Sequence, residues 1–269
     1  MRGRTTGLFT SHRCGTAIVC LSILGLAFSP AVLHAVPINH GDFSGTTVDF
    51  LDVTEDSNTP GDVPPLFGAP TVTGDSLDFN PIGFSASASG ASGVDQTDGQ
   101  LSFMIVAKSG KGIQTITLSE AGDTGLAGFG TDTTFTEVKA NVFVDIVEVD
   151  NVAVAPINII DSMTFMPSGG DFGLATDGGG GPTFNSTWTG GVLIDVGSLV
   201  PPNSVVTKVK VNLDNTLTAL SEDGTSAFIA KKDFDGLVIT VDEMVIPEPT
   251  TALLALSGML ALTCSRRRS

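Results

Sequence analysis

Acidic side chains supply most of the chemistry available to this chain, whose 269 residues include 29 Asp and Glu against 13 Lys and Arg. Several lie in polar stretches where carboxylate, amide and carbonyl oxygens could hold calcium. The calcium candidates are Glu55, Asp56 and Asp62, then Asp95 and Asp98, and finally Asp214 beside Asn215. None has the full EF-hand spacing, so a solvated turn is the competing interpretation of each. Calcium is therefore a candidate cofactor without an assigned site.

Nucleophilic and zinc-dependent catalysis lack their usual residues between positions 36 and 246. This segment has one histidine, His40, and no cysteine or tyrosine. A Ser-His-Asp or Cys-His mechanism would depend on His40, which we expect in a mobile terminus. Two carboxylates could serve a glycoside hydrolase, but Trp188 and the 14 phenylalanines of this segment fit a core better than a sugar-stacking platform. The sequence favours a protein without enzymatic activity.

The N-terminal residues have the three parts of a secretory signal peptide. Arg2, Arg4 and Arg13 are followed by an apolar run from Ala17 to Phe28, and cleavage is expected after Ala35. The alternative is an uncleaved N-terminal anchor. Either interpretation predicts that the residues after position 35 are exported.

The C-terminal residues 247–269 also have three parts. Pro247, Glu248 and Pro249 form a stiff, extended tripeptide, because proline fixes φ and donates no backbone hydrogen bond. The uncharged run from Thr250 to Cys264 is a candidate transmembrane helix, although about 22 Å of helix is short against a hydrocarbon core of roughly 30 Å. Arg266, Arg267 and Arg268 would then remain on the cytoplasmic side.

This tail resembles the PEP-CTERM sorting signal of exported bacterial proteins. The resemblance implies that Pro247, Glu248 and Pro249 are recognised by an exosortase, a membrane-embedded cysteine protease or transpeptidase of Gram-negative bacteria that make extracellular polysaccharide. It also implies transient insertion into the inner membrane, oriented by the three arginines. Such tails are sometimes labelled as the C-terminal region of ice-binding proteins. An ordinary membrane anchor is the alternative, and the resemblance says nothing about residues 36–246, here called the body.

The body is strongly acidic and has no cysteine. All six arginines lie outside it, so seven lysines oppose 28 acidic residues and give a formal charge of −21. Such a charge disfavours nucleic acid and anionic lipid as partners. Cys14, Cys20 and Cys264 lie outside the body, so its stability cannot come from disulfides within it.

Short apolar or alternating runs, separated by Gly, Asp, Asn, Pro and Ser, predict an all-β, antiparallel sandwich of jelly-roll-like form. The predicted strands are Thr46–Val53, Thr71–Phe79, Gly83–Ser87, Leu101–Ala107, Ile113–Ser119, Val138–Val149, Val152–Ile160, Phe184–Thr189, Val192–Val196, Val205–Leu213, Thr216–Leu220, Ser226–Lys231 and Leu237–Ile246. We expect a hairpin around Gly110 and a flexible loop over residues 85–99. A second loop over residues 169–182 is a candidate boundary between two subdomains.

These observations divide the chain into a signal peptide (1–35), a β-sandwich body (36–246) and a sorting tail (247–269). The leading hypothesis is an exported, non-enzymatic protein of the cell surface or extracellular matrix, processed by an exosortase. The alternative is a carbohydrate-binding module, with or without calcium, that binds extracellular polysaccharide. A hydrolase using a carboxylate pair is a third hypothesis.

Overall fold

A computed structural model describes residues 36–57, 59, 61–179, 181–232 and 235–245. Their regular secondary structure is almost entirely antiparallel β-strand, with two short 3₁₀ turns, and the strands belong to one compact unit. The strands are β1 (Ile38–Ser44), β2 (Val48–Asp56), β3 (Thr71–Thr73), β4 (Ser76–Phe79), β5 (Ser85–Ser89), β6 (Gly93–Ala107), β7 (Lys111–Ala127), β8 (Phe135–Val149), β9 (Val152–Ser162), β10 (Thr164–Met166), β11 (Asp171–Gly173), β12 (Thr183–Asp195), β13 (Val206–Ser221), β14 (Ser226–Lys231) and β15 (Leu237–Val245). The 3₁₀ turns are Ser168–Gly170 and Gly197–Leu199.

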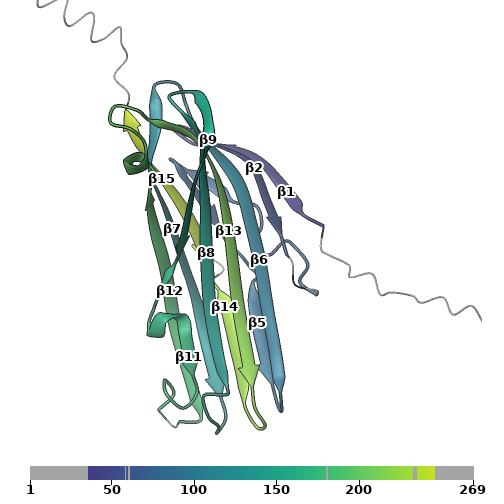
Figure 1. Cartoon of the computed structure of the whole chain (residues 1–269). Coiled ribbons are helices and arrows are strands. Elements are labelled where there is room, and N and C mark those ends of the chain that lie inside the picture. Colours follow the sequence, from purple (N-terminus) through teal and green to yellow (C-terminus); the bar gives the residue numbers. More distant parts are fainter. Residues whose placement is uncertain (1–35, 58, 60, 180, 233–234, 246–269) are drawn as a thin grey trace, which may run out of the picture. The chain divides into compact units, whose positions relative to one another are not determined.

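The strands form a sandwich of two layers (Figure 1). One layer has the order β1-β2-β6-β13-β8-β9. In the other, β7 pairs with β12 along one edge, and with β15 and then β14 along the opposite edge. A single pair, Val206 with Ile113, joins the two layers at one end. The predicted antiparallel β-sandwich is confirmed at this level.

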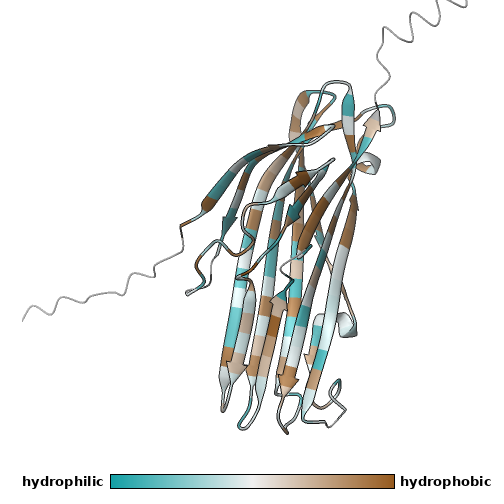
Figure 2. Ribbon diagram, turned by 180° about the vertical axis from the view of Figure 1, so that it is seen from behind, coloured by the Kyte–Doolittle hydropathy of each residue, from teal (hydrophilic) through white to brown (hydrophobic). Residues whose placement is uncertain are grey.

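Strand β13 lies at the centre of its layer and follows the predicted alternation. Val209, Val211 and Leu213 are buried, whereas the side chains between them lie on the outer face. The alternation continues through Asn215 to Ser221, so this region is one strand and the interpretation of Asp214–Asn215 as a turn is wrong. Figure 2 shows the resulting hydrophobic and hydrophilic bands along the strands.

The flexible loop predicted over residues 85–99 is also wrong, because this segment holds β5 and the first half of β6. In β5 the small side chains still alternate, with Ala86 and Ala88 buried and the serines facing outward. Small residues can line a core where two layers approach closely. Their low hydrophobicity hid the strand period in the sequence.

The predicted hairpin around Gly110 does not form. Strand β6 pairs with β2 and β13, whereas β7 pairs along its length with β12, β14 and β15 and meets β13 only at the Val206–Ile113 pair. The tight connection between β6 and β7, closed by a hydrogen bond from the Lys111 N–H to the Lys108 carbonyl, therefore leads from one layer to the other. A turn signal in the sequence does not specify which strand becomes the partner.

Strands β8 and β9 agree closely with their predictions. Val138, Val142 and Ile146 are buried on one face of β8, and the register slips between Ile146 and Glu148, near the predicted irregularity. Strand β9, which contains Pro156, pairs only with β8 within the described residues and so lies at an edge, as expected.

The core contains Trp188, which is 1% exposed and packs edge-on against Phe165, with 5.8 Å between the ring centroids. Its interpretation as a core residue is confirmed, and it cannot serve as a sugar platform from this position. Within the described residues no helix is long and apolar enough to span a membrane. The predicted signal peptide and sorting tail, including Pro247–Pro249 and Arg266–Arg268, lie outside those residues.

Candidate functional site

Two rows of side chains cross the outer face of the β1-β2-β6-β13-β8-β9 layer. They arise because alternate residues of paired strands project to the same side of the sheet. The first row is Thr54, Ser102, Asn212, Phe143 and Ile160. The second row is Asp56, Gln100, Asp214, Asn141 and Ser162. Five strands with a spacing of about 4.8 Å make this face roughly 19 Å wide.

The first row, with Asp56, Gln100 and Asp214 of the second, lines a groove of about 750 Å³, here called the β13 groove. Its lining residues are Pro37, Thr54, Asp56, Gln100, Leu101, Ser102, Phe143, Asp145, Asn158, Ile159, Ile160, Asn212, Leu213 and Asp214. Amides, hydroxyls and carboxylates provide donors and acceptors, while half-buried Phe143 and 71% exposed Ile160 provide apolar surface. The site thus combines directional hydrogen bonding with an apolar contact.

Hydrogen bonds hold some of these polar groups in place. The Asn158 amide donates to Asp145 Oδ1, and the Ser162 hydroxyl donates to Asn141 Oδ1 at 2.8 Å. Both contacts join β8 to β9. The first contact fixes the side of the groove that β9 forms, because Asn158 and Asp145 both line it.

A group of carboxylates borders the groove where β6 approaches the loop after β2. Asp98 donates its backbone N–H to Asp62 Oδ2 at 2.9 Å, and its carboxyl group faces that of Asp214. Burial, followed by the charge of Asp214, raises the pKa of Asp98 from 3.8 to about 6. Burial, reinforced by the charge of Asp95, also raises the pKa of Asp62. Ionisation of one carboxyl group in this cluster therefore makes ionisation of its neighbours less favourable.

The fold therefore brings together calcium candidates from three separate segments, namely Asp62, Asp95, Asp98 and Asp214. Asp56 lies near them as a lining residue of the β13 groove. No group of three or more His, Cys, Asp or Glu in the described part of the chain is arranged to hold a metal ion. Proximity alone thus does not establish a metal site.

Glu55 has a different environment from the other candidates. It is fully buried, and its Oε2 accepts hydrogen bonds from the backbone N–H groups of Leu66 and Phe67 at 2.9 and 2.7 Å. Its Oε1 lies 2.9 Å from His40 Nε2. Glu55 therefore anchors the loop after β2 to the core, and the loop backbone occupies the oxygen that a cation would need.

His40 also differs from its prediction, because it lies in β1 rather than in a mobile terminus. Its partner, Glu55, fixes its orientation beside the loop. Neither a serine nor a cysteine nucleophile is bonded to it among the described residues. The arrangement gives no support to triad chemistry.

Sequence reasoning missed Asn212, Phe143 and Asn158 as site residues. Each occupies an outward position in a strand that was predicted, so the alternation itself contained the signal. Strand order was the missing information, because only the pairing of β13 with β6 and β8 aligns these side chains in rows.

A second hollow, of about 430 Å³, lies around Asp132, Glu137, Asp171 and Asp177. Asp132 is occupied there by hydrogen bonds from the Ala175 and Thr176 N–H groups, both at 2.8 Å. This hollow is lined mainly by carboxylates and lacks the rows of amide and hydroxyl side chains that cross the outer face at the β13 groove. The β13 groove is the better candidate for recognising an uncharged ligand.

No model of a known protein family matches the chain, and no curated protein matches it. Among solved structures, a carbohydrate-binding module of family CBM61 in complex with β-1,4-galactotriose shares 9% identity, over 56% of this chain and 70% of that chain, with a TM-score of 0.17. A CBM28 module specific for non-crystalline cellulose shares 9% identity, over 56% and 74%, with a TM-score of 0.20.

A third similar structure is the enzymatically active domain of tailspike protein 4 from bacteriophage CBA120. It shares 11% identity, over 75% of this chain but only 19% of that chain, with a TM-score of 0.19. Likenesses at these scores carry no argument about function. Any functional proposal must rest on the site itself.

Proposed function

We propose that the body binds extracellular polysaccharide in the β13 groove. The observation that carries this proposal is the alignment of polar side chains in two rows across the sheet, with Phe143 and Ile160 completing the first row in the same groove. Sugar rings present hydroxyls beside apolar C–H faces, and this mixture of groups suits both. An extended chain could follow the rows across the sheet.

The charge of the body predicts the class of polysaccharide. Asp56, Asp145 and Asp214 in the groove, together with the acidic surroundings, would repel a polymer rich in uronic acid or sulfate. Neutral and amino-substituted polysaccharides are the expected ligands. Recognition of this kind needs no metal ion, so binding is expected to persist in a chelator.

The test is a glycan array incubated with the purified protein, with and without a chelator. The proposal predicts binding to neutral or cationic glycans, weaker binding to acidic ones, and a signal that an Asn212→Ala variant loses. Asn185→Ala is the matched control, because Asn185 lies on β12 in the other layer. Equal binding by the wild type and Asn212→Ala would refute the assignment of the groove.

The export of this body is a second part of the proposal and rests on the sequence. The signal-peptide pattern of residues 1–35 and the PEP-CTERM-like tail support delivery to the cell surface or extracellular matrix through an exosortase. We place no catalytic residue in the body. The same glycan preparations, assayed for released reducing ends, would reveal a hydrolase if the carboxylate pair of Asp98 and Asp214 acted on them.

A further inference from the structure

Three polar side chains meet inside the core, away from the β13 groove. Glu120 on β7, Asn215 on β13 and Lys231 on β14 are 2%, 0% and 3% exposed. Glu120 and Lys231 belong to one layer and Asn215 to the other. Their side chains therefore bridge the two layers of the sandwich.

Glu120 contacts both nitrogen-bearing partners through the same carboxylate. Lys231 Nζ lies 2.6 Å from Oε2, and Asn215 Nδ2 lies 2.6 Å from Oε1 and 2.7 Å from Oε2. Nζ and Oε2 are close enough for an ion pair, but the angles between them do not meet those of a hydrogen bond. Since both nitrogens adjoin one oxygen, the lysine amine and the asparagine carboxamide are held side by side.

Aromatic rings enclose this group. Lys231 Nζ lies 5.1 Å from the ring centroid of Phe84, 5.8 Å from Phe67 and 5.9 Å from Trp188. Complete burial lowers the pKa of Lys231, although Glu120 opposes the shift. A desolvated lysine beside a carboxylate can lose its proton to that carboxylate, which leaves a neutral, nucleophilic amine.

The asparagine carbonyl lacks a partner. Asn215 Oδ1, an acceptor, and Trp188 Nε1, a donor, are both buried without a hydrogen-bond partner among the residues that the structure describes. Unpartnered polar atoms are rare in a core, because each one costs desolvation energy without return. Asn215 Oδ1 is therefore a buried acceptor without a donor among the described residues.

We propose that the side chains of Lys231 and Asn215 become joined by an amide bond after the protein folds, with Glu120 as the proton-transfer group. Glu120 takes a proton from Lys231, and neutral Nζ attacks Cγ of Asn215. The Cγ–Nδ2 bond then breaks as Glu120 protonates Nδ2 and accepts the remaining proton from Nζ. One C–N bond forms, one breaks, and ammonia leaves without oxidation or reduction.

The product leaves fewer charged and unpartnered polar groups in the core than the reactants do. An ion pair in a dry interior carries a desolvation cost that a neutral amide and a protonated carboxyl avoid. Protonated Glu120 can donate its O–H to the new amide carbonyl, the former Asn215 Oδ1, and its other oxygen can accept the amide N–H. The bond would also fasten the two layers covalently in a body that has no cysteine.

Mass spectrometry of the full chain after trypsin digestion tests the proposal. Cleavage after Lys210 and Lys232 yields one peptide, residues 211–232, that contains both reacting side chains. The amide predicts that this peptide is lighter than its sequence by one ammonia, resists cleavage after Lys231, and gives no backbone fragments from between the two joined residues. A linear peptide of unaltered mass would overturn the proposal.

A succinimide at Asn215 would also remove ammonia, but it leaves Lys231 cleavable and permits fragments between positions 215 and 231. That pattern would likewise count against the amide. The Glu120→Gln variant keeps both reactants and is expected to show the unaltered mass, whereas Glu148→Gln on β8 should retain the ammonia loss. The wild-type peptide decides the matter even if Glu120→Gln does not fold.

Discussion

Asp98 shows how much the behaviour of one carboxyl group depends on its position in the fold. Its raised pKa comes first from burial and then from Asp214, with which it shares the outer face of the sheet. Glu55, in contrast, is buried where backbone N–H groups and His40 stabilise it. An ionised carboxylate therefore destabilises the fold at Asp98, whereas at Glu55 it stabilises the loop through hydrogen bonds.

Asp98→Asn should make the protein more stable at pH 7. The folded-state pKa of Asp98, about 6, exceeds its ordinary value of 3.8, so ionisation of this group above pH 6 lowers the stability of the native state. That cost is relieved as the pH falls from 6 towards 4. Solvent screens the partly exposed carboxyl, so the expected gain is roughly 1 kcal/mol. Urea unfolding of both proteins at pH 7 and pH 4 would measure it, and identical pH dependence would contradict the explanation.

Glu55→Ala should destabilise the fold by about 3 kcal/mol, because it leaves the buried N–H groups of Leu66 and Phe67 without their charged acceptor. Asp56→Ala, which changes the adjacent and more exposed carboxylate, should alter stability by less than about 1 kcal/mol. The comparison is made by chemical denaturation. Similar losses in the two variants would show that Glu55 is not the anchor we describe.

At the scale of elements, the close approach of β7, β12 and β14 depends on a missing side chain. Gly122 on β7 lies against Trp188, and a Cβ atom there would come within 2.0 Å of the indole ring and 2.3 Å of the Ala230 carbonyl oxygen. A glycine inside a strand often marks such an approach. Here it lets the layer pack over the aromatic group that surrounds Lys231.

Gly122→Ala should therefore cost about 3 kcal/mol in stability or prevent folding, since neither a packed tryptophan nor a backbone carbonyl can move away cheaply. Gly191→Ala on β12 is the control, because the nearest atom to its Cβ would be 3.5 Å away. Thermal unfolding of both variants measures the difference. A Gly122→Ala protein as stable as the control would mean that the packing is looser than described.

The strands could be predicted where large hydrophobic residues alternated, as in β13 and β8, but not where alanine and serine alternated, as in β5. Pairing could not be predicted, because the turn at Gly110 has the residues of a hairpin although it connects two layers. For the site, the sequence indicated Asp62, Asp98 and Asp214 as separate clusters. Their convergence, and the buried meeting of Glu120 with Asn215 and Lys231, depend on contacts between distant segments.

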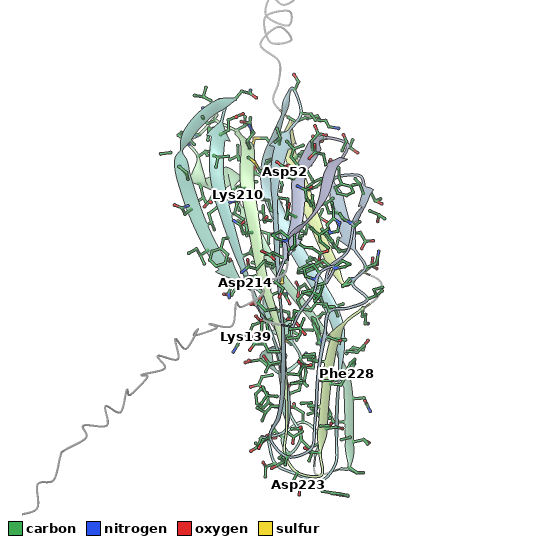
Figure 3. The ribbon with its side chains drawn as sticks, turned by 90° about the vertical axis from the view of Figure 1, so that its right-hand side faces the viewer. Asp52, Lys139, Lys210, Asp214, Asp223 and Phe228 are labelled. Carbon is green, nitrogen blue, oxygen red and sulfur yellow. The ribbon has the colours of Figure 1, made fainter. Side chains whose placement is uncertain are left out.

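At the scale of the whole molecule, we propose that the chain is an acidic binding body between two targeting segments. The body presents polar rows on the outer face of one layer, and Figure 3 shows Asp214 on that side and Phe228 on the other side of the sandwich. A PEP-CTERM-like tail would deliver such a body to a surface rich in polysaccharide. The proposed ligand and the proposed destination therefore agree.

Replacement of Pro247, Glu248 and Pro249 by three alanines should block processing of the tail in a host with the matching exosortase. The unprocessed precursor would stay in the membrane fraction, because its apolar run and its arginines are unchanged. Immunoblotting of membrane and surface fractions measures the outcome. Normal maturation of this variant would show that the tripeptide is not the recognition element.

The most direct test of the central claim compares two phenylalanine variants in affinity electrophoresis through gels containing neutral polysaccharides. Phe143→Ala removes the apolar contact of the β13 groove, whereas Phe228→Ala removes a 46% exposed ring from β14 in the other layer. The account predicts that the wild type and Phe228→Ala are retarded by the same polysaccharide and that Phe143→Ala loses at least tenfold in affinity, or roughly 1.4 kcal/mol. Equal retardation of all three proteins, or retardation of none, would contradict it.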